Sequence, residues 1–182
     1  MKQFLRRIAL LSALTALLLA CADSIVDRGD AYKVWETKPL EYRYEVYAAS
    51  GKRIDRGEVG SVPPQFVMID GDVLKMTLGY GTNAYDCVYY RLPEGLKSNA
   101  FPNAIAECGD YVLYMGVEDD RAVLKAEKPF DRTATPYRYE VPDLNPSFTF
   151  DSVSVDSASH TVSLRYVSGT GTDQNFRVTL PQ

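Results

Sequence analysis

Few residues in this sequence have the type and spacing that catalysis needs. The 182-residue chain has one histidine, His160, in an expected turn over residues 157–160, where an imidazole is usually just solvated. It has no G-x-S-x-G segment that would present a nucleophile. Residues 169–172, Gly-Thr-Gly-Thr, lack the lysine and the following helix of a phosphate-binding loop. We therefore expect no catalytic residue and no cofactor, and the sequence predicts that the protein is not an enzyme.

Metal ligands are also sparse. With one histidine and no C-x-x-C segment, the chain offers no tetrahedral ligand set at the usual spacing. Acidic turns around Asp70, Asp72, Asp119 and Asp120 could supply oxygen ligands, but none has the twelve-residue pattern of a calcium loop. Acidic residues in turns more commonly serve turn geometry. The sequence therefore predicts no metal site.

Tyrosine is the most informative residue type, with 13 Tyr against 7 Phe and one Trp. Each tyrosine combines a large apolar ring with a hydroxyl that needs a partner. The candidate ligand-binding residues are the aromatic residues on the inward parity of the expected strands: Tyr44, Tyr139, Phe150 and Tyr166. They predict a pocket for a small amphipathic molecule. The alternative is that the tyrosines only satisfy strand propensity and pack across the sheets.

The elements that would position these residues are β-strands. Segments 40–46, 137–141, 162–166 and 176–180 alternate apolar and polar residues, which is typical of strands with one buried face. The pentapeptide Tyr-Arg-Tyr-Glu-Val occurs twice, at residues 42–46 and 137–141 in these segments. Their flanking residues differ, so we reject a duplicated domain and interpret both as half-buried strands with inward tyrosines and solvated charges.

Turn residues join these strands into hairpins. Asp70-Gly71-Asp72 links two apolar runs, and Asp-Gly is a strong hairpin signal because both residues tolerate positive φ. Residues 118–121, 156–159 and 50–52 predict three further hairpins. A shift of parity near residues 151–152 is typical of a β-bulge.

The N-terminus has the pattern of an export signal. Lys2, Arg6 and Arg7 precede an uncharged, mostly apolar run over residues 8–20, which is short for a membrane span. We predict a signal peptide over residues 1–20; the alternative is a short anchor helix. Three of the 20 basic residues lie in this segment, so the remaining chain has 17 basic against 24 acidic side chains, a net charge of −7. This charge argues against nucleic acid as a partner and against a second, electrostatic attachment to anionic lipid.

The run ends in Leu18-Leu19-Ala20-Cys21, which resembles the lipobox of bacterial lipoproteins. The resemblance implies cleavage after Ala20 and acylation of Cys21, so that the protein is held on a membrane by its lipid. Ala22 follows the cysteine, and in the family's sorting rule the absence of aspartate there implies the outer membrane. The alternative is an ordinary signal peptide with a chance cysteine.

Cys87 and Cys108 remain in the exported chain. Because an exported protein meets an oxidising compartment, an even pair of cysteines there predicts a disulfide. A loop of this length would contribute about 3 kcal/mol in the chain-entropy account. The alternative is two buried free thiols.

The lipobox, an acidic tether over residues 21–34, and Trp35 just before the first strand together resemble the lipocalin-like lipoproteins of Gram-negative bacteria. The resemblance implies one all-β domain over residues 35–182, an antiparallel up-and-down barrel of about eight to ten strands that binds a small ligand. A β-sandwich is the alternative fold. The alternative function is a non-catalytic envelope interaction or structural protein with a filled β-domain, whose protein partner the sequence does not name.

Overall fold

The computed structural model describes residues 23–81, 84–119, 121–143 and 150–181. The predicted signal peptide and Cys21 lie outside these residues. The described residues form fifteen β-strands and no α-helix, so the all-β class is confirmed. In this part of the chain no helix has the length and apolarity needed to cross a bilayer.

The strands form four antiparallel sheets, A to D, each built from consecutive strands. Sheet A comprises β1 (Ser24–Arg28), β2 (Tyr32–Lys38), β3 (Glu41–Tyr47) and β4 (Arg53–Gly60). Sheet B comprises β5 (Gln65–Met68), β6 (Val73–Gly81), β7 (Ala84–Arg91) and β8 (Leu96–Pro102). Sheet C comprises β9 (Ala104–Cys108), β10 (Tyr111–Glu118), β11 (Arg121–Glu127) and β12 (Tyr137–Glu140). Sheet D comprises β13 (Ser152–Asp156), β14 (Thr161–Val167) and β15 (Asp173–Thr179).

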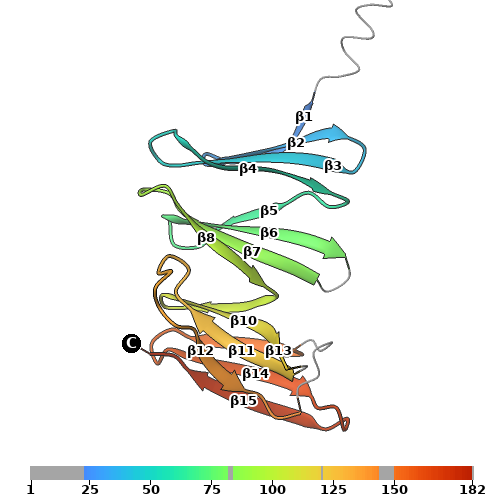
Figure 1. Ribbon diagram of the computed structural model, residues 1–182, viewed down its shortest axis with the longest axis vertical. Helices are drawn as coiled ribbons and strands as arrows, with labels where there is room; N and C mark the ends of the chain where they lie inside the picture. The colour runs from blue at the N-terminus through green and yellow to red at the C-terminus, as the bar shows by residue number, and fades with distance from the viewer. Residues whose placement is uncertain (1–22, 82–83, 120, 144–149, 182) are drawn as a thin grey trace, which may run out of the picture.

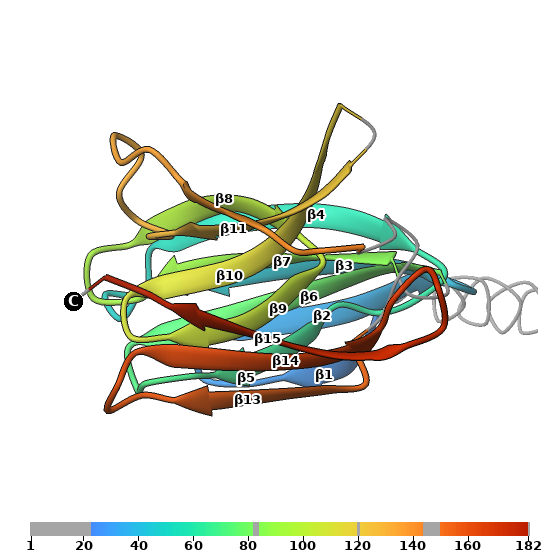
Figure 2. The same cartoon turned by 90° about the horizontal axis from the view of Figure 1, so that it is seen from below.

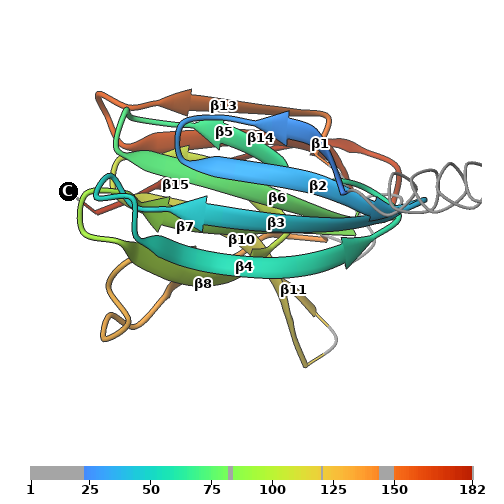
Figure 3. The same cartoon turned by 90° about the horizontal axis from the view of Figure 1, so that it is seen from above.

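The four sheets are stacked face to face along the long axis of the molecule (Figure 1). Views along that axis show the sheets lying over one another (Figures 2 and 3). Three apolar clusters fill the spaces between sheets, and we call them the A–B, B–C and C–D cores. Sheets B and C are therefore buried on both faces, whereas sheets A and D each have one outer face.

The predicted closed barrel is wrong. Each described strand pairs only with strands next to it in the chain, and the first and last strands of each sheet are not paired to each other. The face-to-face packing is closer to the alternative, a β-sandwich, extended to four layers. The reason is visible in β7, where Cys87, Val88, Tyr89 and Tyr90 are all buried. Consecutive buried residues require packing on both faces of a sheet, whereas alternation alone describes a sheet with one buried face.

The repeated pentapeptide has the expected parity in both places. In β3, Tyr44 and Val46 are buried in the A–B core. After β12, Val141 is buried in the C–D core, and Tyr139 packs against that core. Strand β3 is an inner strand of sheet A and β12 is an edge strand of sheet C. Both copies thus turn their tyrosine and valine side chains towards a core, but they occupy different positions in different sheets. This is expected for a repeat that is not a duplicated domain.

The predicted hairpins at residues 50–52, 70–72, 118–121 and 156–159 are confirmed, with Gly51 and Gly71 at positive φ. The bulge predicted near residues 151–152 is present: Ser152 is paired with Arg165, and the Asp151 amide also donates to the Arg165 carbonyl over 2.8 Å, so that two residues oppose one. Phe150 therefore packs against the C–D core on the same side as Val153, whose partner Leu164 lies in that core.

The predicted tether is wrong for most of its length, because β1 and the start of β2 lie within residues 21–34. Gly29 allows the turn between these strands: a Cβ there would lie 2.5 Å from the Tyr32 ring.

Candidate functional site

The four predicted ligand-binding residues do not surround one cavity. Tyr44 is buried in the A–B core, whereas Tyr139, Phe150 and Tyr166 pack in or against the C–D core. Sheets B and C lie between them (Figure 1). The prediction that all four residues line one pocket is therefore wrong, because Tyr44 lies in a different layer from the other three.

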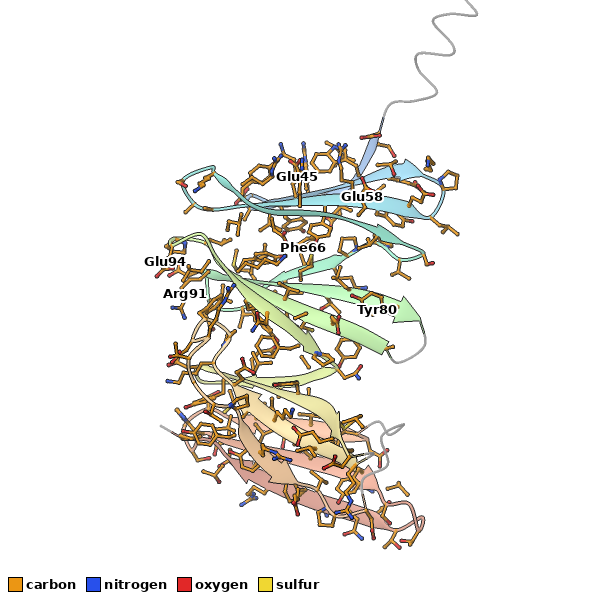
Figure 4. The ribbon with its side chains drawn as sticks, viewed as in Figure 1. Glu45, Glu58, Phe66, Tyr80, Arg91 and Glu94 are labelled. Carbon is orange, nitrogen blue, oxygen red and sulfur yellow. The ribbon has the colours of Figure 1, made fainter. Side chains whose placement is uncertain are left out.

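Tyr44 is held by its neighbours on every side. Its ring lies over Gly57 on the paired strand, where a Cβ would come within 2.6 Å of the tyrosine hydroxyl. Phe66 lies between sheets A and B (Figure 4), with its ring centroid 6.3 Å from that of Tyr44 in an edge-to-face arrangement. The hydroxyl donates to Asp55 Oδ2 over 3.5 Å. Burial first, and then the carboxylate of Asp55, raise the pKa of Tyr44 to about 12.

The other three residues pack together in the C–D layer. Phe150 and Tyr166 meet edge to face with ring centroids 6.1 Å apart. The Tyr166 hydroxyl donates to the carbonyl of Pro142 over 2.7 Å, and the Tyr139 hydroxyl donates to the carbonyl of Thr179 over 3.4 Å. Their rings fill the space between sheets, and their hydroxyls bind backbone carbonyls of the same domain.

Two polar clusters inside the stack were not predicted from the sequence. In the A–B layer, Asp55 accepts a hydrogen bond from the Tyr90 hydroxyl at 2.6 Å and lies 2.7 Å from Lys97 Nζ. In the B–C layer, Glu107 accepts from the Tyr89 hydroxyl at 2.7 Å and pairs with Lys75 Nζ at 2.5 Å. We call these the Asp55 cluster and the Glu107 cluster.

The two clusters have the same composition on opposite faces of sheet B. Adjacent tyrosines of β7 point to opposite faces, and each donates to a carboxylate of the flanking sheet that a lysine of sheet B also contacts. Burial, followed by the nearby carboxylates, raises the pKa of Tyr89 and Tyr90 well above the ordinary value. Both phenols therefore stay protonated near neutral pH and act as hydrogen-bond donors that join the layers.

The predicted disulfide is not formed. Cys87 and Cys108 are buried free thiols, and they belong to different cores. Cys87 faces sheet C from sheet B, whereas Cys108 faces sheet D from sheet C. Sheet C therefore lies between the two thiols, because Cys87 is on the side of sheet C that faces sheet B and Cys108 points to the opposite side. The structure agrees with the alternative prediction, in which both cysteines are buried free thiols.

His160, at a positive φ of 51°, lies in the expected β13–β14 turn. Its Nδ1 is 3.2 Å from the carbonyl of Pro181. Within the described residues, no group of three or more His, Cys, Asp or Glu side chains could hold a metal ion.

A charged groove of about 830 Å³ lies on the side of the stack, beside the β10–β11 hairpin. Figures 2 and 3 show this hairpin projecting beyond the other sheets. Glu118 pairs with Lys125 over 2.6 Å and also with Arg138. The hydrogen bond from Lys125 is the main cause that lowers the pKa of Glu118, and the charge of Arg138 lowers it further. Arg121 and Glu140 also line the groove, and neither forms an ion pair with another described residue.

The two outer faces of the stack differ in composition. The outer face of sheet D carries hydroxyl, amide and guanidinium groups: Ser152, Ser154, Ser163, Arg165, Asn175 and Arg177. The outer face of sheet A carries charged and aromatic side chains: Lys33, Trp35, Arg43, Glu45, Tyr47, Arg53, Arg56 and Glu58. Glu45 and Glu58 are labelled on sheet A at the top of the stack in Figure 4.

No protein-family model, curated protein or solved structure matches the chain. The functional proposal therefore rests on the residues and their arrangement.

Proposed function

We propose that this protein is a lipoprotein of the cell envelope, anchored in the outer membrane through acylated Cys21, and that its sheets form a non-catalytic interaction domain. The anchor is supported by the sequence, where a charged start and an apolar run end in Leu18-Leu19-Ala20-Cys21. A single acyl chain binds a membrane only reversibly, whereas the several chains of a bacterial lipoprotein anchor would hold the domain firmly on the membrane.

One observation favours an interaction domain over a small-ligand carrier. The rings that would have lined a ligand cavity fill the spaces between sheets, and their hydroxyls bind groups of the same domain. A ligand carrier needs a concave, mostly apolar site. The groove beside the β10–β11 hairpin has a charged lining instead, which suits a polar partner better than an amphipathic molecule.

Arg121 and Glu140 are the residues most available to such a partner. They lie in the same groove, carry opposite charges and lack ion-pair partners among the described residues. A protein surface with complementary charges would find both signs here, and charge complementarity contributes mainly to specificity and association rate.

The anchor is tested by labelling growing cells with a fatty-acid analogue. The wild-type protein should carry the label and fractionate with the outer membrane, and Cys21→Ser should carry none. Ala22→Asp is the matched control for location, because it should keep the label and move the protein to the inner membrane. Equal labelling of the wild type and Cys21→Ser would refute acylation at Cys21.

The interaction domain is tested in two ways. Native mass spectrometry of the purified chain should show no co-purifying small molecule; a stoichiometric ligand would support the carrier instead. A photo-crosslinking residue at position 140 should give a discrete protein adduct in cells, one at position 177 should not, and Arg121→Glu should weaken the adduct at 140. Adducts of equal intensity at both positions would argue against the groove.

A further inference from the structure

The outer face of sheet A combines aromatic rings with basic side chains in fixed pairs. Arg43 lies over the ring of Trp35, with its Cζ 4.8 Å from the ring centroid. Lys33 lies over the ring of Tyr47, with Nζ 5.7 Å from the centroid. Ile25, paired directly with Trp35, is 50 % exposed. This face therefore presents amphipathic rings beside cations, the composition that membrane interfaces favour.

Asp23 fixes where the chain reaches this face. Its carboxylate Oδ2 lies 3.0 Å from Arg43 Nη2, and Arg43 is on the outer face of sheet A. Cys21 precedes Asp23 by two residues, so their Cα atoms are at most about 8 Å apart at 3.8 Å per residue. A lipid on the Cys21 thiol must therefore enter the membrane close to this face, because the chain between them is too short to span a gap.

We propose that the outer face of sheet A rests on the phospholipid headgroups of the membrane that holds Cys21, with Trp35 and Tyr47 at the depth of the headgroup layer. This inference rests on the proposed lipid anchor. Glu45 is paired with Arg53, and Asp23 with Arg43, whereas Arg56 forms no ion pair with a described residue and is available to lipid phosphates. The outer face of sheet D, at the opposite end of the stack, points away from the membrane.

This face has only a small excess of basic side chains, and the exported chain is acidic. The strand registers place six basic side chains outward beside four acidic ones: Arg28, Lys33, Lys38, Arg43, Arg53 and Arg56 beside Asp23, Glu41, Glu45 and Glu58. The net charge of −7 provides no general attraction to anionic lipid. The face should therefore meet the headgroups only when the anchor holds it there, and the unattached domain should not bind vesicles.

Trp35 makes this inference directly measurable, because it is the single tryptophan of the chain. The chain from Cys21 onward retains every described residue, and its Cys21 thiol can be coupled to a maleimide lipid in vesicles of phosphatidylethanolamine and phosphatidylglycerol. Cys87 and Cys108 are buried and should not compete for the maleimide. Lipids brominated near the headgroup should then quench Trp35 emission about twofold, as expected for a ring at the interface.

Two controls separate the orientation from simple proximity to vesicles. Attachment at the other end, through Cys21→Ser with Ser154→Cys, leaves Trp35 in place and should abolish the quenching. Attachment through Cys21 with Trp35→Phe and Asn175→Trp moves the reporter to sheet D and should also abolish it. Lys33→Glu with Arg56→Glu should reduce the quenching, whereas Arg165→Glu with Arg177→Glu on sheet D should not.

The outcomes separate this inference from the anchor. Because the coupling is chemical, it does not depend on acylation in the cell, which fatty-acid labelling tests independently. Unquenched Trp35 with attachment through Cys21 would overturn the orientation, and so would equal quenching in both attachments. Quenching of Trp35 with attachment through Cys21, and none with attachment through Ser154→Cys, would support the orientation. This one comparison is sufficient without the other variants.

Discussion

The C–D and B–C layers of the stack are joined in different ways. Among the described residues, the C–D core has fourteen buried members, all apolar or aromatic side chains, whereas the B–C core has five. The C–D layer has hydrogen bonds from Tyr139 and Tyr166 to backbone carbonyls. The B–C layer has a similar bond from the Tyr85 hydroxyl to the carbonyl of Ala104, and it also has the charged links of the Glu107 cluster. Sheets B and C are also joined by a single residue, Asn103, between β8 and β9.

This difference indicates that the stack is not equally stable along its length. Hydrophobic stabilisation scales with the apolar area removed from water, so the larger C–D core should be the more stable layer. The B–C layer relies more on hydrogen bonds, each of which contributes only about 0.5–1.5 kcal/mol net, or about 1.5–3 when a charged group is involved. We therefore expect local opening to begin between sheets B and C.

The largest expected effect is a cavity in the C–D core. Leu164 is 1 % exposed, and Leu164→Ala should lower the free energy of unfolding by about 2–5 kcal/mol, because it removes buried methyl groups from a filled layer. Urea unfolding followed by circular dichroism measures this change. Val153→Ala, at an exposed site in the same sheet, is the control and should cost much less. Equal losses for both would contradict the assignment of the C–D core.

Alkaline pH should weaken the layers that tyrosines join. Burial and neighbouring carboxylates raise the pKa of Tyr44 to about 12, and raise the pKa of Tyr89 and Tyr90 as well. The folded protein keeps these phenols protonated where the unfolded chain ionises them. Their stabilisation is therefore complete below about pH 10, the ordinary value for tyrosine, and is lost as the pH rises towards the raised pKa.

This alkaline loss can be followed by urea unfolding at several pH values and by phenolate absorbance. Part of the absorbance change should coincide with unfolding, while the exposed tyrosines titrate before it. Titration of all 13 tyrosines near their ordinary pKa in the folded protein would contradict the buried positions.

Tyr89→Phe tests the polar link of the B–C layer. The substitution keeps the ring and removes a hydrogen bond to the Glu107 carboxylate, so it should cost about 1.5–3 kcal/mol, the range for bonds to charged groups. Tyr90→Phe, on the other face of the same strand, is the matched variant for the Asp55 cluster. If only Tyr89→Phe increased hydrogen exchange in β9, the clusters would act separately. No loss in either variant would refute their role in joining the sheets.

The two free thiols can compare the layers within one molecule. Cys87 lies in the B–C core and Cys108 in the C–D core, and both are almost fully buried. If the B–C layer opens first, a thiol reagent at low urea should modify Cys87 at least about tenfold faster, equivalent to about 1.4 kcal/mol of opening free energy. Mass spectrometry after timed quenching gives both rates. Faster modification of Cys108 would reverse the proposed order of stability.

The local structure could be predicted from the sequence where one or two neighbouring residues decide it. The alternation in the repeated pentapeptide gave the buried parity of β3 correctly, and Asp70-Gly71 gave the turn before β6. The layered architecture could not be predicted in this way, because alternation says which face is buried and not what covers it. The signal for two covered faces lies in runs of consecutive buried residues, which occur in β7 of sheet B and in β10 and β11 of sheet C.

The Asp55 and Glu107 clusters could not be predicted from local sequence patterns, because their members are far apart in the chain. Asp55 and Tyr90 are 35 residues apart, and Glu107 and Tyr89 are 18 apart, so no local pattern joins them. Within its own strand each carboxylate is typical of a solvated position. The ligand pocket was predicted from the same inward parity that the structure confirms for Tyr44, but the space that Tyr44 enters is filled by other side chains.

The pairing of each strand with its neighbours in the chain has a consequence for how the protein folds. Proteins rich in local contacts fold faster than those whose strands pair across long loops, and most all-β domains belong to the slow group. Here each sheet is complete once its own three or four consecutive strands are present. A chain that leaves a translocation channel from its N-terminus could therefore form sheet A before sheet B has emerged, and complete the A–B core once residue 102 is free. Folding would then proceed from the N-terminal sheet outward, without waiting for the C-terminus.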